Sequence, residues 1–194
     1  MVYNADPHIC QTALAALRTI IGAGSPVTMA SLNAPKQEAY RLVDIEDGER
    51  GITYEKLFAP YLADARHIRI VDPYVRLDYQ VRNLVQLLSI VQLQQGCQVT
   101  LLTMYEKNER YGLSEEHISR QRLEALRERL TQRGIAFSYA FDPQMHDRCI
   151  ETEDWHIILG RGLDLYYPPE SGRPYLSQTR RARKCRIIFL PKRE

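Results

Sequence analysis

The chain has 194 residues, of which 44% are hydrophobic and 26% are charged, so it is a globular protein with room for one domain and a short appendage. No apolar run approaches the ~20 residues that span a bilayer, and no basic segment followed by an apolar one marks a secretory leader. The formal net charge of +2 argues against a chain that is basic throughout, so any electrostatic function depends on where the charges gather.

The cysteines are scattered along the chain without a C-x-x-C pair. They are Cys10, Cys97, Cys149 and Cys185. This spacing predicts free thiols in a reducing compartment and argues against a zinc site, so we expect neither a metal nor a cofactor. With no leader pattern, we expect a cytoplasmic protein.

Residues 1–35 differ from the rest and are predicted to be an N-terminal helical extension and linker, with the main domain at 36–194. Asp6 and Pro7 are a cap and a first helical residue. An apolar stripe at helical spacing follows, formed by Leu14, Leu17 and Ile21. This helix either packs on the main domain or on a dimer mate, or it docks another protein.

From residue 40 onward, strand and helix patterns alternate. In chain order we expect a strand at 40–45, a helix at 54–62, a strand at 67–72, a helix at 77–95, a strand at 99–104, a helix at 114–133, and strands at 135–140 and 185–190. This order predicts an α/β domain with a mixed sheet flanked by helices.

Between the last two strands, the stretch from His146 to Asp164 is predicted to form two short strands. His146 and Arg148 are two residues apart, so on one strand they would point to the same face. Gly160 and Gly162 break the pattern and allow a tight backbone path.

The polar residues of this stretch keep the spacing of the phospholipase D signature, H-x-K-x-x-x-x-D-x-x-x-x-x-x-G-S-x-N, in which the His attacks phosphorus and the Lys binds phosphate. The identities are degenerate. Arg148, Glu153 and Arg161 stand where the signature has Lys, Asp and Ser, and Asp164 lies one residue beyond the position of its Asn. An arginine binds phosphate in a bidentate manner, whereas a carboxylate at 164 repels a phosphodiester unless an arginine neutralises it.

The chain also resembles one family, the phospholipase D-like domain found C-terminal to MIT domains. Four motifs carry the resemblance in order: G-I-T-Y-E-K-L-F at 51–58, D-P-Y at 72–74, H-D-R at 146–148 and G-R-G-L-D at 160–164. It implies a non-catalytic phospholipase D fold that dimerises and binds acidic phospholipid headgroups. Eukaryotic members work with the ESCRT membrane-scission machinery, but a single short N-terminal helix is not the three-helix bundle of an MIT domain.

The candidate site residues allow several roles. His146 is either a nucleophile that needs a second His across a dimer axis, a hydrogen-bonding residue of a binding pocket, or a structural histidine. Arg148 and Arg161 either bind an anion or close internal ion pairs, Arg148 with Glu153 or Asp147 and Arg161 with Asp164. Asp72 either orients His146 or Arg161, or forms an Asx-turn after Pro73.

The C-terminal stretch is strongly basic. Residues 173–193 contain eight Lys or Arg and no Asp or Glu. The candidate ligand-binding residues of this basic tail are Arg180, Arg181, Arg183, Lys184 and Arg186. It is either a patch for acidic headgroups or a nucleic-acid backbone, or a solvated edge of the sheet.

Together these patterns predict a single phospholipase D-like domain that binds phosphate-rich anions without catalysis. The family resemblance implies an acidic phospholipid headgroup as the ligand, whereas the residues alone allow lipid or nucleic acid equally. The expected protein is a homodimeric adaptor peripheral to a membrane. The alternatives are a degenerate phosphodiesterase, a nuclease or a nucleic-acid-binding protein that uses His146 and the basic tail, or an adaptor for an unidentified protein partner whose tail is only a solubilising edge.

Overall fold

A computed structural model describes residues 40–91, 96–105, 109–110, 113–168 and 180–192. The predicted N-terminal extension, residues 1–35, lies outside these ranges. Among the described residues, no helix is both long enough and apolar enough to cross a membrane.

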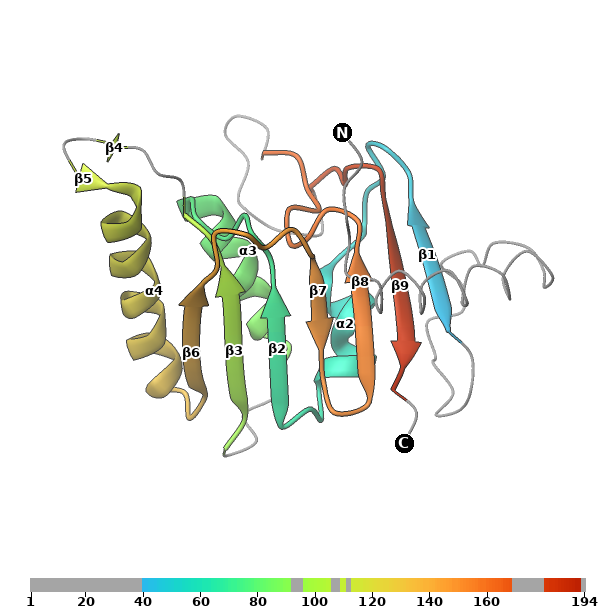
Figure 1. Cartoon of the computed structure of the whole chain (residues 1–194). Coiled ribbons are helices and arrows are strands. Elements are labelled where there is room, and N and C mark those ends of the chain that lie inside the picture. Colours follow the sequence, from blue (N-terminus) through green and yellow to red (C-terminus); the bar gives the residue numbers. More distant parts are fainter. Residues whose placement is uncertain (1–39, 92–95, 106–108, 111–112, 169–179, 193–194) are drawn as a thin grey trace.

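A seven-stranded mixed sheet forms the centre of the domain, with strand order β1-β9-β8-β7-β2-β3-β6 (Figure 1). Its strands are β1 (Arg41–Ile45), β2 (His67–Val71), β3 (Gln98–Thr103), β6 (Ala136–Phe141), β7 (Cys149–Glu151), β8 (Trp155–Leu159) and β9 (Cys185–Pro191). β2, β3 and β6 are parallel, and the other neighbouring pairs are antiparallel. The predicted mixed α/β architecture is therefore confirmed. Two short strands, β4 (Glu109–Arg110) and β5 (Leu113–Ser114), pair separately.

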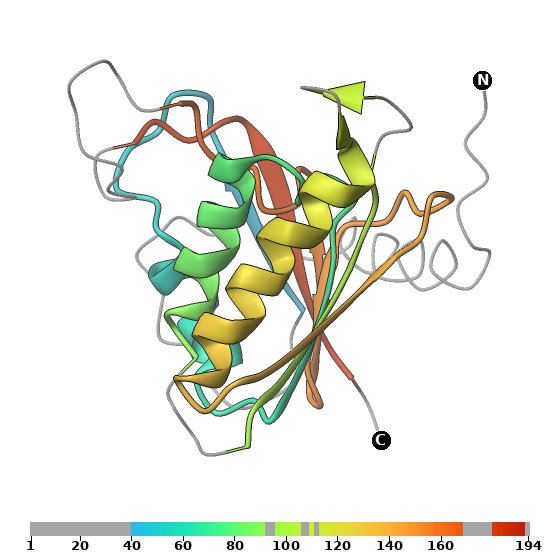
Figure 2. The ribbon, with the colours of Figure 1, turned by 90° about the vertical axis from the view of Figure 1, so that its left-hand side faces the viewer.

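Three described helices, α2 (Tyr54–Leu62), α3 (Asp78–Leu88) and α4 (Glu115–Thr131), cover one face of the sheet (Figure 2). Two of them begin at side-chain caps, because Thr53 Oγ1 accepts from Lys56 N and Ser114 Oγ accepts from His117 N. α3 ends at Leu88, earlier than the predicted 77–95, and residues 92–95 lie outside the described part.

The core lies between the sheet and these helices. On β2, Ile68 and Ile70 are buried while His67 and Arg69 are exposed, as expected for a strand with one covered face. Fully buried core side chains include Leu57, Phe58, Leu84, Ile70 and Phe189. Each such side chain contributes about 1.5–3 kcal/mol by leaving water, so the helices are held firmly on the sheet.

Candidate functional site

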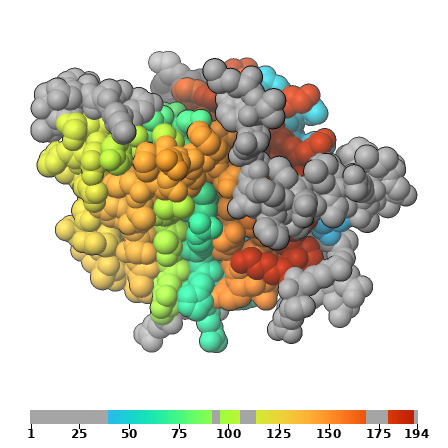
Figure 3. Space-filling model, viewed as in Figure 1, coloured from blue at the N-terminus to red at the C-terminus, as the bar shows by residue number. Residues whose placement is uncertain are grey.

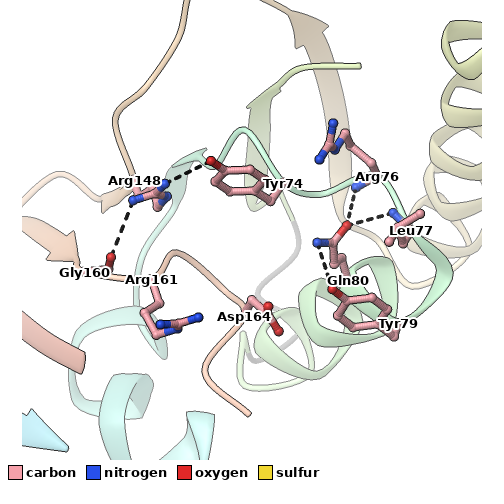
Figure 4. Close-up of a pocket in the computed structure, with 9 residues that line it drawn as sticks. All are labelled: Tyr74, Arg76, Leu77, Tyr79, Gln80, Arg148, Gly160, Arg161 and Asp164. Carbon is pink, nitrogen blue, oxygen red and sulfur yellow. Dashed lines mark hydrogen bonds between the residues drawn. The ribbon is translucent and has the colours of Figure 1, made fainter. Parts of the chain in front are cut away.

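A pocket of about 450 Å³ lies just beyond the carboxyl end of β2, which is parallel to β3. It is lined by Tyr74, Arg76, Leu77, Tyr79, Gln80, Arg148, Gly160, Arg161 and Asp164 (Figure 4). These residues come from the connection between β2 and α3, the first turn of α3, the approach to β7, and the turn after β8. The carboxyl ends of parallel strands are the usual position of ligand sites in open α/β sheets.

Asp72 organises the wall of this pocket, although it does not line it. Its side chain is only 2% exposed. Oδ1 accepts from the backbone N–H of Tyr74 at 2.9 Å, and Oδ2 accepts from that of Leu163 at 2.7 Å. The first bond is the Asx-turn that the sequence allowed. Burial raises the pKa of the Asp72 carboxyl, while these two N–H groups oppose the rise.

The turn after β8 is clamped at Leu163. Besides its bond to Asp72, its carbonyl oxygen accepts from Tyr54 Oη and from Asn83 Nδ2, the latter at 3.1 Å. Gly162 adopts a φ of +62°, and a Cβ there would lie 2.7 Å from Asp72 Cγ. The predicted tight backbone path at Gly162 is therefore confirmed, and its reason is the close approach to a buried carboxylate.

Gly160 allows a second close approach. A Cβ there would lie 2.9 Å from the carbonyl oxygen of Arg186, and Gly160 N donates to that oxygen at 2.9 Å. The turn is thus held against β9 on one side and against Asp72 on the other.

Arg148 reaches the pocket from the segment before β7. Its guanidinium lies 4.9 Å from the centre of the Tyr74 ring, and Nη2 donates to Tyr74 Oη at 3.3 Å. Nη1 makes a long contact of 3.5 Å to the Gly160 carbonyl. Nε is buried and has no hydrogen-bond partner among the described residues. The ion pairs considered from sequence, with Glu153 or Asp147, are not formed in the part of the chain that the structure describes.

Arg161 and Asp164 line the same pocket but do not pair with each other. Asp164 Oδ2 instead lies 3.5 Å from Arg183 Nη1, and its Oδ1 is buried without a described partner. Arg161 is exposed, and no described carboxylate lies within ion-pair distance of it. The internal ion pair considered for Arg161 is thus replaced by one between Asp164 and the basic tail.

The pocket includes residues that the sequence did not single out. Arg76 lies beside the Tyr74 ring, with Cζ 5.5 Å from the ring centre. Gln80 Oε1 accepts from the N–H groups of Arg76 and Leu77, which fixes the entry into α3. Nothing in the spacing marks Arg76 or Gln80. Their position after a parallel strand and before a helix is the signal that could have found them.

His146 and Glu153 lie away from the pocket. Residues 146–148 precede β7, so the prediction that His146 and Arg148 share a strand is wrong. β7 begins at Cys149, opposite Val71, and β2 then ends at Asp72-Pro73, which leaves the preceding residues no partner on that side. Asp147 and His146 are exposed and outside the lining.

Glu153 occupies the turn at the far end of β7. It accepts from the backbone of Arg66 and His67, and its Oε1 lies 2.9 Å from His67 Nδ1. It therefore fixes the start of β2, and it cannot orient His146 in the way that the phospholipase D spacing implies.

The basic tail is largely engaged within the protein. Arg180 is 4% exposed, donates to Asn83 Oδ1 and the Tyr167 carbonyl, and stacks on Tyr166. These contacts favour a structural role for Arg180 over the expected ligand-binding one. Lys184 lies 3.5 Å from Glu46, and Arg186 donates to both oxygens of Asp44 at 2.7 and 2.9 Å. Arg181 is exposed and lies over Tyr167.

Comparisons of the chain with known proteins point to one family. A family model described as "Phospholipase D-like domain at C-terminus of MIT" matches residues 51–188. The mouse protein "MIT domain-containing protein 1" is 28% identical over 134 residues, which cover 68% of this chain and 52% of the mouse protein. The chain thus spans about half the length of that curated relative.

Two solved structures show weaker likenesses. One is that of TrmBL2, described as an archaeal chromatin protein with a novel mode of DNA binding; the TM-score is 0.39 at 10% identity, covering 95% of this chain and 54% of that one. The other is a phosphatidylserine synthase from Haemophilus influenzae Rd KW20, with a TM-score of 0.46 at 8% identity, covering 98% of this chain and 43% of that one.

Proposed function

The chain belongs to the family of phospholipase D-like domains found at the C-terminus of MIT, and from this premise we propose that it is a non-catalytic module that binds a phosphate-bearing anion in the pocket at the end of β2. The observation that carries the proposal is the convergence of Arg76, Arg148 and Arg161 on one pocket of about 450 Å³. A pocket of this size holds a headgroup-sized ligand.

The chemistry of the lining supports an anionic ligand. Guanidinium groups bind phosphate through two parallel N–H donors, and Arg148 has a buried Nε with no described partner. Asp164 adds a carboxylate to the lining, but Arg183 lies 3.5 Å from it and offsets its charge. The pocket therefore keeps a positive balance despite the acidic residue.

The same lining favours binding over catalysis. A phospholipase D mechanism needs a nucleophilic histidine and a group that protonates the leaving oxygen. Among the described residues that line the pocket there is no histidine, lysine, serine or cysteine. His146 lies on the exposed approach to β7, outside that lining.

We further propose that the anion is an acidic phospholipid headgroup, bound at a membrane surface by a homodimeric adaptor. Tyr74, beside Arg148 and Arg76, is 39% exposed. An exposed aromatic ring among arginines suits the boundary between headgroups and water, where amphipathic rings and long cationic side chains are favoured. The family resemblance supports the same ligand class.

Co-sedimentation with phosphatidylcholine vesicles that contain a phosphoinositide tests this proposal. Arg148→Gln and Arg161→Gln should each weaken binding about fivefold, because a basic residue near an anionic surface contributes about 1 kcal/mol. The double variant should lose about 25-fold if the two contributions add.

Two charge-matched variants serve as controls. Arg186→Gln removes a tail arginine that is already bound to Asp44, and Arg129→Gln removes an exposed arginine in the last turn of α4. Both should bind vesicles nearly as well as the wild type. If Arg186→Gln weakens binding as much as the pocket double variant, the tail is the site. Tighter binding to DNA or RNA than to vesicles in the same buffer would favour the nucleic-acid alternative.

A further inference from the structure

A second group of chemically active side chains lies on the face of the sheet opposite the helices. Cys149 and Glu151 are two residues apart on β7, so they share this face. His156 on β8 is the register partner of Glu151, and Ile158 is that of Cys149. The ligand atoms of Cys149, Glu151 and His156 all lie within 4.8 Å of one another.

We propose that Cys149, Glu151 and His156 form a binding site for a zinc-class transition-metal ion. A thiolate sulfur, an imidazole nitrogen and a carboxylate oxygen are the three donor types that Zn²⁺ takes from proteins, and three protein ligands leave a fourth position for water. The site is separate from the anion pocket, because none of its three residues lines that pocket.

The surroundings of the three ligands suit a bound ion. Cys149 is 6% exposed and packs against Val71 and Met145, which form a dry wall on the sulfur side. Glu151 Oε1 lies 3.1 Å from His156 Nδ1, so these two ligand atoms are close enough to bind one ion. Arg69 Nη1 donates to the other carboxylate oxygen, Oε2, at 3.0 Å. An outer hydrogen bond of this kind orients a ligating carboxylate and leaves one oxygen for the metal.

A nucleophilic triad is the competing use of a cysteine, a histidine and a carboxylate. Cys149 is only 6% exposed and packs among apolar side chains, whereas a catalytic cysteine needs an accessible sulfur in an electropositive environment. Metal binding does not require a free thiolate beforehand. The incoming ion replaces the thiol proton, which passes to solvent, and the sulfur then coordinates as a thiolate.

The position of the cluster leaves it reachable from solvent. The described helices all lie on the other side of the sheet, and Figure 3 shows β3, β2 and part of the β7–β8 hairpin at the surface of this face. Glu151 and His156 are half-buried, which gives an ion an entry path past the carboxylate. Among the described residues, this is the one cluster of three groups whose ligand atoms meet in this way.

Cobalt titration of the untagged full chain tests the proposal, because Co²⁺ substitutes for Zn²⁺ and gives a thiolate-to-metal absorption band. We expect binding of one ion, this band in the near ultraviolet, and its loss when Zn²⁺ is added. Cys149→Ser should abolish the band, and His156→Gln should weaken affinity at least ~100-fold, since even outer partners of a ligand are worth 10–100-fold.

The chain offers matched controls. Cys185→Ser removes a half-buried thiol outside the cluster, and His67→Gln removes the histidine of the exposed His67–Glu153 pair. Both should bind Co²⁺ like the wild type. Zn²⁺ should raise the melting temperature of the wild type and of the controls but not that of His156→Gln. The melting transition of His156→Gln without metal also shows that this variant folds.

Three results would overturn the inference: no Co²⁺ binding by the wild type at millimolar metal, binding without a sulfur band, or full affinity in His156→Gln. The Arg148→Gln/Arg161→Gln double variant should bind Co²⁺ normally, so failure of the metal site and failure of the anion pocket are distinguishable.

Discussion

Gly162→Ala tests the clamp that builds the pocket wall. Gly162 combines two features, a φ of +62° and a position where a Cβ would lie 2.7 Å from Asp72 Cγ and 2.9 Å from Oδ1. An alanine must therefore accept a left-handed backbone and push away a carboxylate. Asp72 is buried between the N–H groups of Tyr74 and Leu163, so it cannot move without losing a hydrogen bond.

The expected cost is the sum of these two effects. A left-handed backbone costs an alanine about 1–2 kcal/mol. Losing one hydrogen bond to a buried charged group costs about 1.5–3 kcal/mol. Gly162→Ala should therefore lower the free energy of unfolding by about 2.5–5 kcal/mol, a large share of the roughly 5–15 kcal/mol of a natural domain.

Gly134→Ala separates the two effects. Gly134 follows α4 with a φ of +77°, but a Cβ there would meet nothing within 4 Å. Gly134→Ala should therefore lower the free energy of unfolding only by the cost of a left-handed backbone, about 1–2 kcal/mol. Urea unfolding followed by the fluorescence of Trp155, the single tryptophan of the chain, measures both variants. If Gly162→Ala costs no more than Gly134→Ala, the close packing of Gly162 on Asp72 is refuted.

Two further predictions concern catalysis and assembly. The purified chain should cleave no phospholipid, DNA or RNA faster than His146→Ala does. This variant should keep most of its vesicle affinity, because the positive charge of the pocket comes from arginines. Cleavage that His146→Ala abolishes would establish the phosphodiesterase alternative. Light scattering should give twice the chain mass of 22.5 kDa, because one copy of the half-site motif implies a homodimer. A monomer at micromolar concentration would contradict that expectation and remove any route to a two-histidine site.

Regular hydrophobic spacing and local capping made much of the fold predictable from sequence. β1, α2, β2, β3 and α4 lie within one or two residues of their expected bounds, and Thr53 and Ser114 cap the helices that they precede. α3 was predicted too long because the apolar pattern continues to Val91, which is buried although the helix ends at Leu88. Hydrophobic periodicity indicates which residues are buried, and here the buried positions continue beyond the last residue of the helix.

Side-chain contacts between residues that are far apart in the sequence could not be predicted. Arg148 and Arg161 were expected to bind an anion, and the structure places both on one pocket with Arg76. The partners of the acidic residues were missed, because Asp44 meets Arg186 across 142 residues and Asp164 meets Arg183 instead of Arg161. The proposed metal site was also invisible in the spacing of the cysteines, since only the register of β7 and β8 brings His156 to Glu151.

One buried carboxylate links the two halves of the anion pocket. Burying the Asp72 carboxylate is unfavourable by itself and raises the pKa of the group, and two backbone hydrogen bonds offset part of that cost. One of these bonds holds Tyr74, on which Arg76 and Arg148 stack. The other holds Leu163, two residues beyond Arg161. Asp72 therefore fixes the backbone next to Arg76 and Arg161 before a ligand arrives, so the free energy of binding does not have to offset the entropy lost in ordering that backbone.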